Sequence, residues 1–177
     1  MSARRRAAAL LALTLTGVLV GCSEESVKKI ERTMPAALPD VTLDGFDGGP
    51  ELELGDLRGP AVINLWASWC EPCEEEMPIL QEYSEKYDGT VQMIGVDFQD
   101  AQSGEAADIA ARLGITYPLY TDYEGVINEP PLPYARTMPM MLFVDEAGDV
   151  VGVEYIVVET VADMEEKVEK HLGVSPL

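Results

Sequence analysis

The chain has 177 residues, of which 47% are hydrophobic and 25% charged, a composition typical of one globular domain and not of a disordered segment. Its formal net charge of −20 argues against nucleic-acid binding, because phosphates would be repelled. Three cysteines are too few for a disulfide scaffold, and an odd number cannot all pair with one another.

The amino terminus has the features of a secretory signal. Residues 4–6 are arginines, and residues 7–20 carry no charge. This apolar stretch is shorter than the roughly 20 residues needed to span a bilayer. The sequence Leu19-Val20-Gly21-Cys22 resembles a bacterial lipobox, which implies removal of residues 1–21 and lipidation of Cys22. A plain signal peptide and an uncleaved anchor are the alternatives.

The next segment, residues 22–38, is predicted to be a flexible tether, because it is polar and charged without an apolar period. Fully extended, residues 23–38 would span about 50 Å at roughly 3.3 Å per residue. Cleavage before Cys22 removes three arginines and no acid, so the net charge falls from −20 to −23. The folded domain is predicted over residues 39–177, lipid-anchored to the cell membrane and outside the cytoplasm, where disulfides persist.

The hydrophobic pattern of this domain alternates between the periods of strands and helices. Residues 61–66 are apolar except for Asn64, which predicts a buried strand, and Glu146-Ala147-Gly148-Asp149 is a hairpin turn signal. Helices between strands imply right-handed parallel crossovers, and the hairpin adds antiparallel strands, so we predict an α/β sandwich around one central mixed sheet. The predicted strands are 51–54, 61–66, 91–96, 118–120, 140–145 and 150–155, and the predicted helices are 71–87, 106–113 and 161–172.

The sequence Cys70-Glu71-Pro72-Cys73 lies where a predicted buried strand passes into a predicted helix. This context indicates a redox pair, because zinc would need two further ligands and the chain has no other suitable cysteine and only His171. We therefore predict no metal and no cofactor. Cys70 is expected at or near the N-cap, where free N–H groups and the helix dipole stabilise a thiolate. Cys70 would attack and Cys73, one turn further in, would resolve the mixed disulfide, while Pro72 fits the first turn.

The residues around this pair resemble the active site of the thioredoxin superfamily, in the run Trp66-Ala67-Ser68-Trp69-Cys70-Glu71-Pro72-Cys73. The following Glu76-Met77-Pro78 is similar to the W-C-x-P-C-x-x-E-x-P pattern of its membrane-anchored, extracytoplasmic TlpA/ResA-like branch. The resemblance covers about residues 35–173. It implies a thioredoxin-like sandwich with extra N-terminal strands. It also implies thiol–disulfide oxidoreductase activity on disulfide-bearing envelope proteins, with a transmembrane thiol as electron donor. The weaker similarities are Leu38-Pro39-Asp40, residues 54–59, Tyr117-Pro118 and Met138-Pro139.

The resemblance also implies a cis peptide bond before Pro139, beside the cysteines. The backbone of Met138 would then be free to pair with an extended substrate strand. An ordinary trans proline at the start of a strand is the alternative. The chain departs from the family at Met140-Met141, where threonines are usual, and at the Pro-rich residues 128–134, which either recognise a partner or only lengthen the loop.

The acids around the cysteines bear on the direction of electron flow. Glu71 lies between the cysteines, and Glu74, Glu75 and Glu76 follow. Acids disfavour a nearby thiolate, whereas a strong oxidant needs a highly stabilised one. We therefore predict a reductase, with a potential nearer the roughly −270 mV of thioredoxin than the roughly −120 mV of a strong oxidase. The Glu-Pro dipeptide also resembles that of family members that reduce apocytochrome c.

Proton transfer at Cys73 needs a titratable group. Asn64 stands where thioredoxin has a buried aspartate, and an asparagine cannot titrate. Asp100 aligns best with an acidic residue found beside the cysteines in ResA-like proteins, and Asp97 and Glu76 are the other candidates. Each could equally be a solvated or capping acid.

The remaining candidates have simpler interpretations. Trp69 and Pro72 are expected to contact the substrate, Trp66 to lie in the core, and His171 to be structural near a helix end. Two rival functions stay open. A thiol peroxidase would usually carry a Pro-x-x-x-Thr pattern before its cysteine, which residues 66–70 lack, and a surface lipoprotein could use the fold for binding alone.

Overall fold

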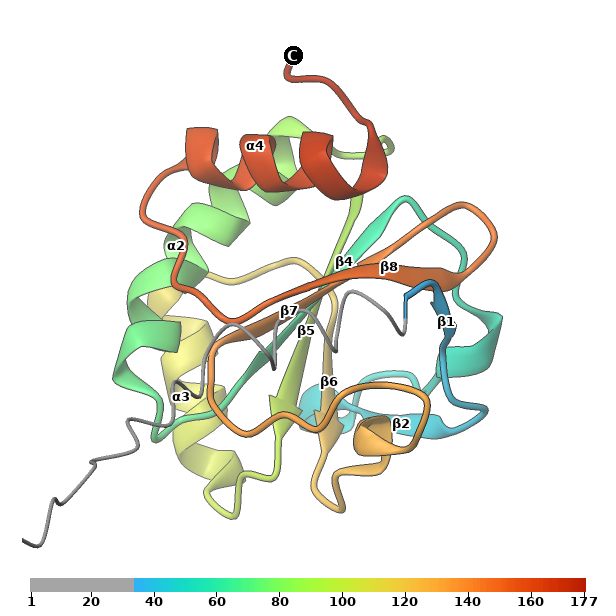
Figure 1. The fold of residues 1–177 in the computed structure, drawn as a ribbon. Helices are drawn as coiled ribbons and strands as arrows, with labels where there is room; N and C mark the ends of the chain where they lie inside the picture. Colours follow the sequence, from blue (N-terminus) through green and yellow to red (C-terminus); the bar gives the residue numbers. More distant parts are fainter. Residues whose placement is uncertain (1–33) are drawn as a thin grey trace, which may run out of the picture.

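The computed structural model describes residues 34–177, which form a central mixed sheet with helices packed against it (Figure 1). The strand order is β1-β8-β7-β4-β5-β6-β2-β3. In it β4, β5 and β6 are parallel, and the other neighbouring pairs are antiparallel. The elements are β1 (Ala36–Ala37), β2 (Thr42–Gly45), β3 (Leu52–Glu53), β4 (Ala61–Trp66), α2 (Glu71–Lys86), β5 (Gln92–Phe98), α3 (Ser103–Leu113), β6 (Leu119–Asp122), β7 (Met140–Val144), β8 (Asp149–Glu154) and α4 (Val161–Leu172).

The two faces of the sheet are covered by different parts of the chain. Side chains alternate along a strand, so on β4 Val62 and Trp66 pack against residues of α2, α3 and α4. Ile63, on the opposite face, packs against buried residues from segments 36–57 and 127–132. All three helices therefore lie on one face. This follows from the right-handed crossovers through α2 and α3, which step in the same direction across the sheet.

The predicted α/β architecture around one mixed sheet is confirmed, including the hairpin formed by β7 and β8 and the extra strands before β4. Boundaries differ by a few residues. Helix α3 begins at Ser103, three residues before the expected start, and β5 continues to Phe98. The predicted strand 51–54 is shorter, because a 3-10 turn takes over at Leu54.

The predicted tether over residues 22–38 is wrong at its end. Ala36 and Ala37 form β1 and pair with Val150 and Asp149 of β8, and Leu38 is buried. The physical reason is that β1 covers part of the edge of β8, whose backbone groups would otherwise be unpaired. The predicted signal peptide, Cys22 and the rest of the tether lie outside the described residues. Among residues 34–177, no helix combines the length and apolar character that a membrane crossing requires.

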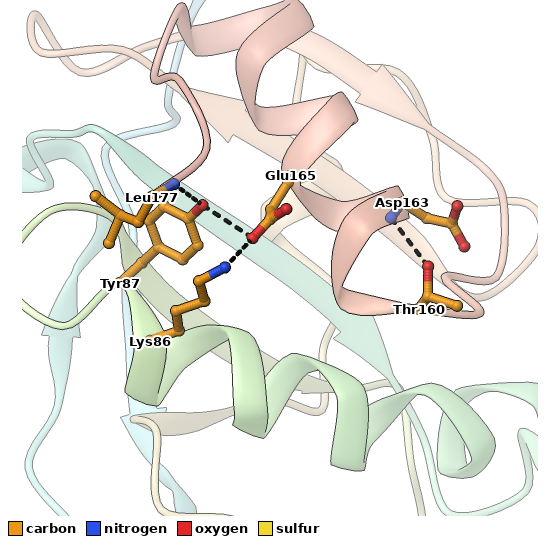
Figure 2. Close-up of polar contacts among 6 residues, drawn as sticks. All are labelled: Lys86, Tyr87, Thr160, Asp163, Glu165 and Leu177. Carbon is orange, nitrogen blue, oxygen red and sulfur yellow. Dashed lines mark hydrogen bonds and ion pairs between the residues drawn. The ribbon is translucent and has the colours of Figure 1, made fainter.

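The carboxyl-terminal end of α2 is fixed to α4 by a polar cluster (Figure 2). One carboxylate oxygen of Glu165 accepts hydrogen bonds from Lys86 at 2.6 Å and from the Tyr87 hydroxyl at 3.0 Å. The same hydroxyl accepts a hydrogen bond from the N–H of Leu177 at 2.9 Å, and the side chain of Thr160 caps α4. These contacts hold one end of the helix whose other end carries the cysteines.

Candidate active site

Cys70 and Cys73 form a disulfide at the start of α2, with their Cα atoms 5.3 Å apart. After β4 ends at Trp66, a turn closed by a 3.0 Å hydrogen bond from the Cys70 N–H to the Ala67 carbonyl brings Cys70 to the N-cap. The Cys70 sulfur accepts a hydrogen bond from the Cys73 N–H at 3.3 Å. It therefore lies at the positive end of the helix dipole, where a thiolate is stabilised, as the sequence predicted.

The two sulfurs differ in access to solvent. Cys70 is 5% exposed, whereas Cys73 is fully buried. Trp69, 57% exposed, and Pro72, also exposed, flank the more accessible cysteine. An attacking thiolate must reach the substrate, but a resolving thiol needs to reach only its partner. The arrangement therefore suits attack by Cys70 and resolution by Cys73.

The loop before β7 lies at the same end of the sheet. The Met138–Pro139 peptide bond is cis, as predicted, and Pro139 is buried. Met138 packs against the cluster that contains both cysteines. Met140 pairs with Leu65 of β4, so the loop lies next to the strand end that leads to Cys70. Pairing of Met138 with a substrate strand stays a prediction.

The four acids predicted to surround the helix start have different environments. Glu71 and Glu75 are exposed, and Glu74 forms an ion pair with Arg112 of α3 at 2.9 Å. Solvent weakens the effect of such surface charges without removing it. Glu76 faces the protein interior instead and is fully buried. The fourth acid is therefore the one with an unusual environment.

Glu76 lies one helical turn after Cys73 on the buried face of α2. Its Oε2 accepts a hydrogen bond from the Val158 N–H at 3.1 Å, and its Oε1 has no partner among residues 34–177. Burial raises the pKa of Glu76 to about 7, against the opposing effects of Val158 and the neighbouring Asn64 side chain. Asn64 itself forms no side-chain hydrogen bond of good geometry within these residues. A carboxyl that titrates near neutral pH is suited to proton transfer.

The two aspartates near the end of β5 differ in the same way. Asp100 accepts hydrogen bonds from the N–H groups of Ser68, at 2.6 Å, and Gln102, at 2.8 Å. Although burial works to raise it, these hydrogen bonds lower the pKa of Asp100, so this carboxylate is charged at neutral pH. Asp97 is fully buried, and its burial, together with the charge and hydrogen bond of Asp100, raises the pKa of Asp97 to about 8. These environments favour a positioning role for Asp100 over the predicted proton transfer.

Two aromatic rings fill the space that Gly95 leaves beside the site. A Cβ at Gly95 would lie 3.1 Å from Tyr117 Cε2 and 3.4 Å from Trp66 Nε1. Both rings are buried, which confirms Trp66 as core. Burial and the charge of Glu76 raise the pKa of Tyr117, which therefore lies near that carboxyl. The sequence did not indicate Tyr117 or Val158 as part of the site, and Val158 contributes a backbone N–H, for which the side chain gives no signal.

The other candidates lie apart from the disulfide or serve packing. His171 stacks on Phe143, with ring centroids 4.4 Å apart, and shares a 2.8 Å hydrogen bond with Glu154, in line with a structural role. In the loop over residues 128–134, Leu132 is buried against the sheet, so this loop has a packing role. Nowhere in residues 34–177 do three or more His, Cys, Asp or Glu side chains gather as a metal site would require.

Known proteins are similar to this chain in sequence and in fold. A model of the AhpC/TSA family matches residues 34–153. Thioredoxin-like protein YneN of Bacillus subtilis is 27% identical over 134 residues, which cover 74% of this chain and 76% of the relative. Thiol-disulfide oxidoreductase ResA of Geobacillus kaustophilus is 32% identical over 143 residues, covering 76% and 73%. A crystal structure described as a thiol:disulfide interchange protein DsbE of Chlorobium tepidum has a TM-score of 0.65 and 27% identity, covering 77% and 93%.

Proposed function

Because this chain belongs to the AhpC/TSA family and is a thiol–disulfide oxidoreductase of the ResA/DsbE type with a thioredoxin-like fold, we propose that it reduces disulfides of envelope proteins outside the cytoplasm. The observation that carries the proposal is the Cys70–Cys73 disulfide at the start of α2, in which Cys70 retains 5% exposure and Cys73 is fully buried. Residues 1–21 and Cys22 would serve as signal peptide and lipid anchor, which keep the domain at the membrane.

The proposed reaction begins with the reduced pair. The Cys70 thiolate attacks a substrate disulfide, so that one substrate sulfur bonds to Cys70 and the other leaves as a thiolate. Cys73 then attacks the Cys70 sulfur, which restores the Cys70–Cys73 disulfide and releases the second substrate sulfur. The proton of the Cys73 thiol passes to Glu76, which is buried one turn away. A transmembrane thiol donor would return two electrons by reducing the disulfide.

The charges around the disulfide favour the reductive direction. Glu71 and Glu75 are exposed at the helix start, and the guanidinium of Arg112 is paired with Glu74. Acids at this position oppose the thiolate that a strong oxidant would need. We include apocytochrome c among the substrates, because Glu71-Pro72 between the cysteines resembles the dipeptide of family members that reduce it.

The test is capture of the substrate. In cells that produce the Cys73→Ser variant, the mixed disulfide on Cys70 cannot be resolved, so envelope proteins should accumulate on the variant and be released by dithiothreitol. The matched control is the double variant Cys70→Ser/Cys73→Ser, which should capture none. Identification of the captured proteins by mass spectrometry gives the substrate, and absence of any captured protein would support a binding function instead.

A redox titration tests the direction. We expect a midpoint for the Cys70–Cys73 pair nearer roughly −270 mV than roughly −120 mV. A midpoint near the second value would contradict the reductase assignment while leaving the oxidoreductase chemistry intact.

A further inference from the structure

Asp97 is a fully buried carboxyl without a hydrogen-bond donor. It lies on β5 between Trp66 of β4 and Thr121 of β6, its partners in the strand register. Neither of its oxygens receives a hydrogen bond from any group of residues 34–177. A buried carboxylate in this position would pay a large desolvation cost with no donor to offset it. Asp97 is therefore expected to carry a proton, which turns it from an acceptor into a donor.

The Asp100 side chain lies within hydrogen-bond reach of Asp97, and an unusual backbone turn separates the two residues. Gln99 has a φ of 49°, in the left-handed region that residues with a Cβ seldom occupy. Its N–H donates to the Asp122 carbonyl at 2.9 Å, which fixes this turn to the end of β6. Beyond the turn, Asp100 uses one oxygen for the N–H of Ser68 and the other for the N–H of Gln102. Asp100 therefore connects the start of α3 to the loop two residues before Cys70.

We propose that Asp97 and Asp100 form a carboxyl pair that shares one proton, held on Asp97, and that Asp97 is a positioning residue for the loop that carries Cys70. The protonated Asp97 donates a hydrogen bond to Asp100. The charged carboxylate of Asp100 is a strong acceptor for this O–H group. That contact fixes the Asp100 carboxylate in the orientation in which it accepts from Ser68. The role of Asp97 is thus indirect, since it acts through Asp100 on the backbone before Cys70.

The electrostatics of the pair agree with this geometry. The pKa of Asp97 is raised to about 8 by burial and by Asp100, whereas the hydrogen bonds of Asp100 lower its own pKa. The pair therefore carries one negative charge at neutral pH and two at alkaline pH. The second charge repels the first and removes the hydrogen bond between them, so the hold on Ser68 should weaken as the pH rises through about 8.

Few other groups near Asp97 could cause a pH-dependent change in the contact between Asp100 and Ser68. The cluster over this part of the sheet contains the N-cap residue Cys70, Cys73 and Met77 of α2, and apolar residues of α3. The two cysteines do not titrate while they form a disulfide. Glu76 of α2, Tyr83 and Tyr117 are further titratable groups on this face, and burial raises the pKa of both tyrosines above their ordinary value of 10, outside the pH range of the experiment. Glu76 lies next to Asn64, which pairs with Gly95, two residues before Asp97 on β5. Glu76 therefore needs its own control.

The experiment follows the backbone amide of Ser68 by two-dimensional NMR in the purified oxidised protein between pH 5 and 9.5. We expect an inflection near pH 8 in the unmodified protein. Asp97→Asn should lose the inflection and keep the low-pH amide position, because its carboxamide still donates to Asp100. Asp100→Asn should displace the amide at every pH, and Glu76→Gln should retain the inflection.

The proposal is overturned if the Ser68 amide shows no inflection near pH 8, if the inflection persists in Asp97→Asn, or if it disappears in Glu76→Gln. Should Asp97→Asn not fold, the carboxyl carbon of Asp97 can be titrated directly in the unmodified protein, and a carboxylate signal at pH 7 would contradict the proposal. No substrate or electron donor takes part, so the outcome is independent of the proposed reductase function.

Discussion

The two ends of helix α2 differ in how their polar groups are satisfied. At the carboxyl-terminal end, Lys86 and Tyr87 both donate to Glu165, and the Tyr87 hydroxyl also accepts from a backbone N–H (Figure 2). Near the amino-terminal end, one oxygen of Glu76 and both oxygens of Asp97 receive no hydrogen bond from a donor among residues 34–177. The same helix thus joins a region of satisfied contacts to a region of buried carboxyls that lack donors.

One end of α2 therefore stabilises the fold, and the other end supplies carboxyl groups that can titrate. An unsatisfied buried polar group costs about 1 to 3 kcal/mol of folding free energy, and burial moves the pKa of a carboxyl toward neutral pH. The raised pKa values of Glu76 and Asp97 are the result. The contacts at the other end of α2 offset such costs without placing any titrating carboxyl near the disulfide.

The largest effect should come from removing the reacting sulfur. We expect Cys70→Ser to reduce insulin disulfides no faster than the uncatalysed exchange, because the hydroxyl of serine cannot form the mixed disulfide. The loss should leave the fold intact, as judged by circular dichroism. Residual turnover well above the uncatalysed rate would mean that Cys73 can attack substrates directly, despite its burial.

Replacing the buried acid next to Cys73 should have the second largest effect. Below its pKa of about 7, Glu76 is protonated and cannot accept the thiol proton, so resolution of the mixed disulfide should accelerate as the pH rises through about 7. In Glu76→Gln this rise should disappear, and the rate should fall by roughly 10²-fold. Stopped-flow measurement of the second step gives both values. Exposed Glu75→Gln is the matched control, and an equal loss there would argue against Glu76 as the proton acceptor.

The protonation of Asp97 should make the free energy of unfolding depend on pH. Its folded pKa of about 8 lies above the ordinary value of 3.8, so the folded state binds more protons than the unfolded state between these pH values. The contribution is complete below about pH 4 and is lost as the pH rises through about 8. Asp97→Asn lacks this loss, so its free energy of unfolding should gain several kcal/mol on that of the unmodified protein between about pH 4 and about pH 8. Urea unfolding at several pH values measures it, with exposed Asp108→Asn as control. Parallel stability curves would contradict the assignment.

The smallest effect is expected from a change at the carboxyl-terminal end of α2, where the polar groups are hydrogen-bonded. Tyr87→Phe removes the hydroxyl that joins Glu165 to Leu177, and it should lower the free energy of unfolding by about 1 kcal/mol. Insulin reduction should not change, since the disulfide lies at the other end of the helix. Tyr123→Phe, at a tyrosine that is 59% exposed, provides the comparison and should be neutral. A drop in activity with Tyr87→Phe would show that the two ends are coupled.

Local sequence patterns predicted the part of this site that depends on local structure. The apolar run over β4 followed by Cys70 and Cys73 specifies a strand, a turn and a helix start, and all three form there. Long-range contacts had no such signal. The hydrogen bond from the Val158 N–H to Glu76 joins residues 82 positions apart. The helical period places Glu76 on the buried face of α2, but neither pattern nor composition shows which backbone group bonds its carboxylate.

The ranking of the aspartates shows the same limit. The resemblance to ResA-like proteins favoured Asp100, but the left-handed turn at Gln99 directs that carboxylate to the Ser68 N–H, and Asp97 is the aspartate buried on β5. A backbone conformation that is rare for glutamine cannot be read from the residue itself.

The missing side chain of Gly95 constrains how this protein can change over evolutionary time. Alanine at this position would press against Tyr117 and Leu119, at 3.1 and 2.5 Å, and approach Trp66. A single substitution there therefore requires the Leu119 side chain and the Tyr117 ring to move, and a second change that shortens Leu119 would remove the larger overlap. Among descendants of this sequence, positions 95 and 119 should therefore change together, which conserves the packing beside the disulfide.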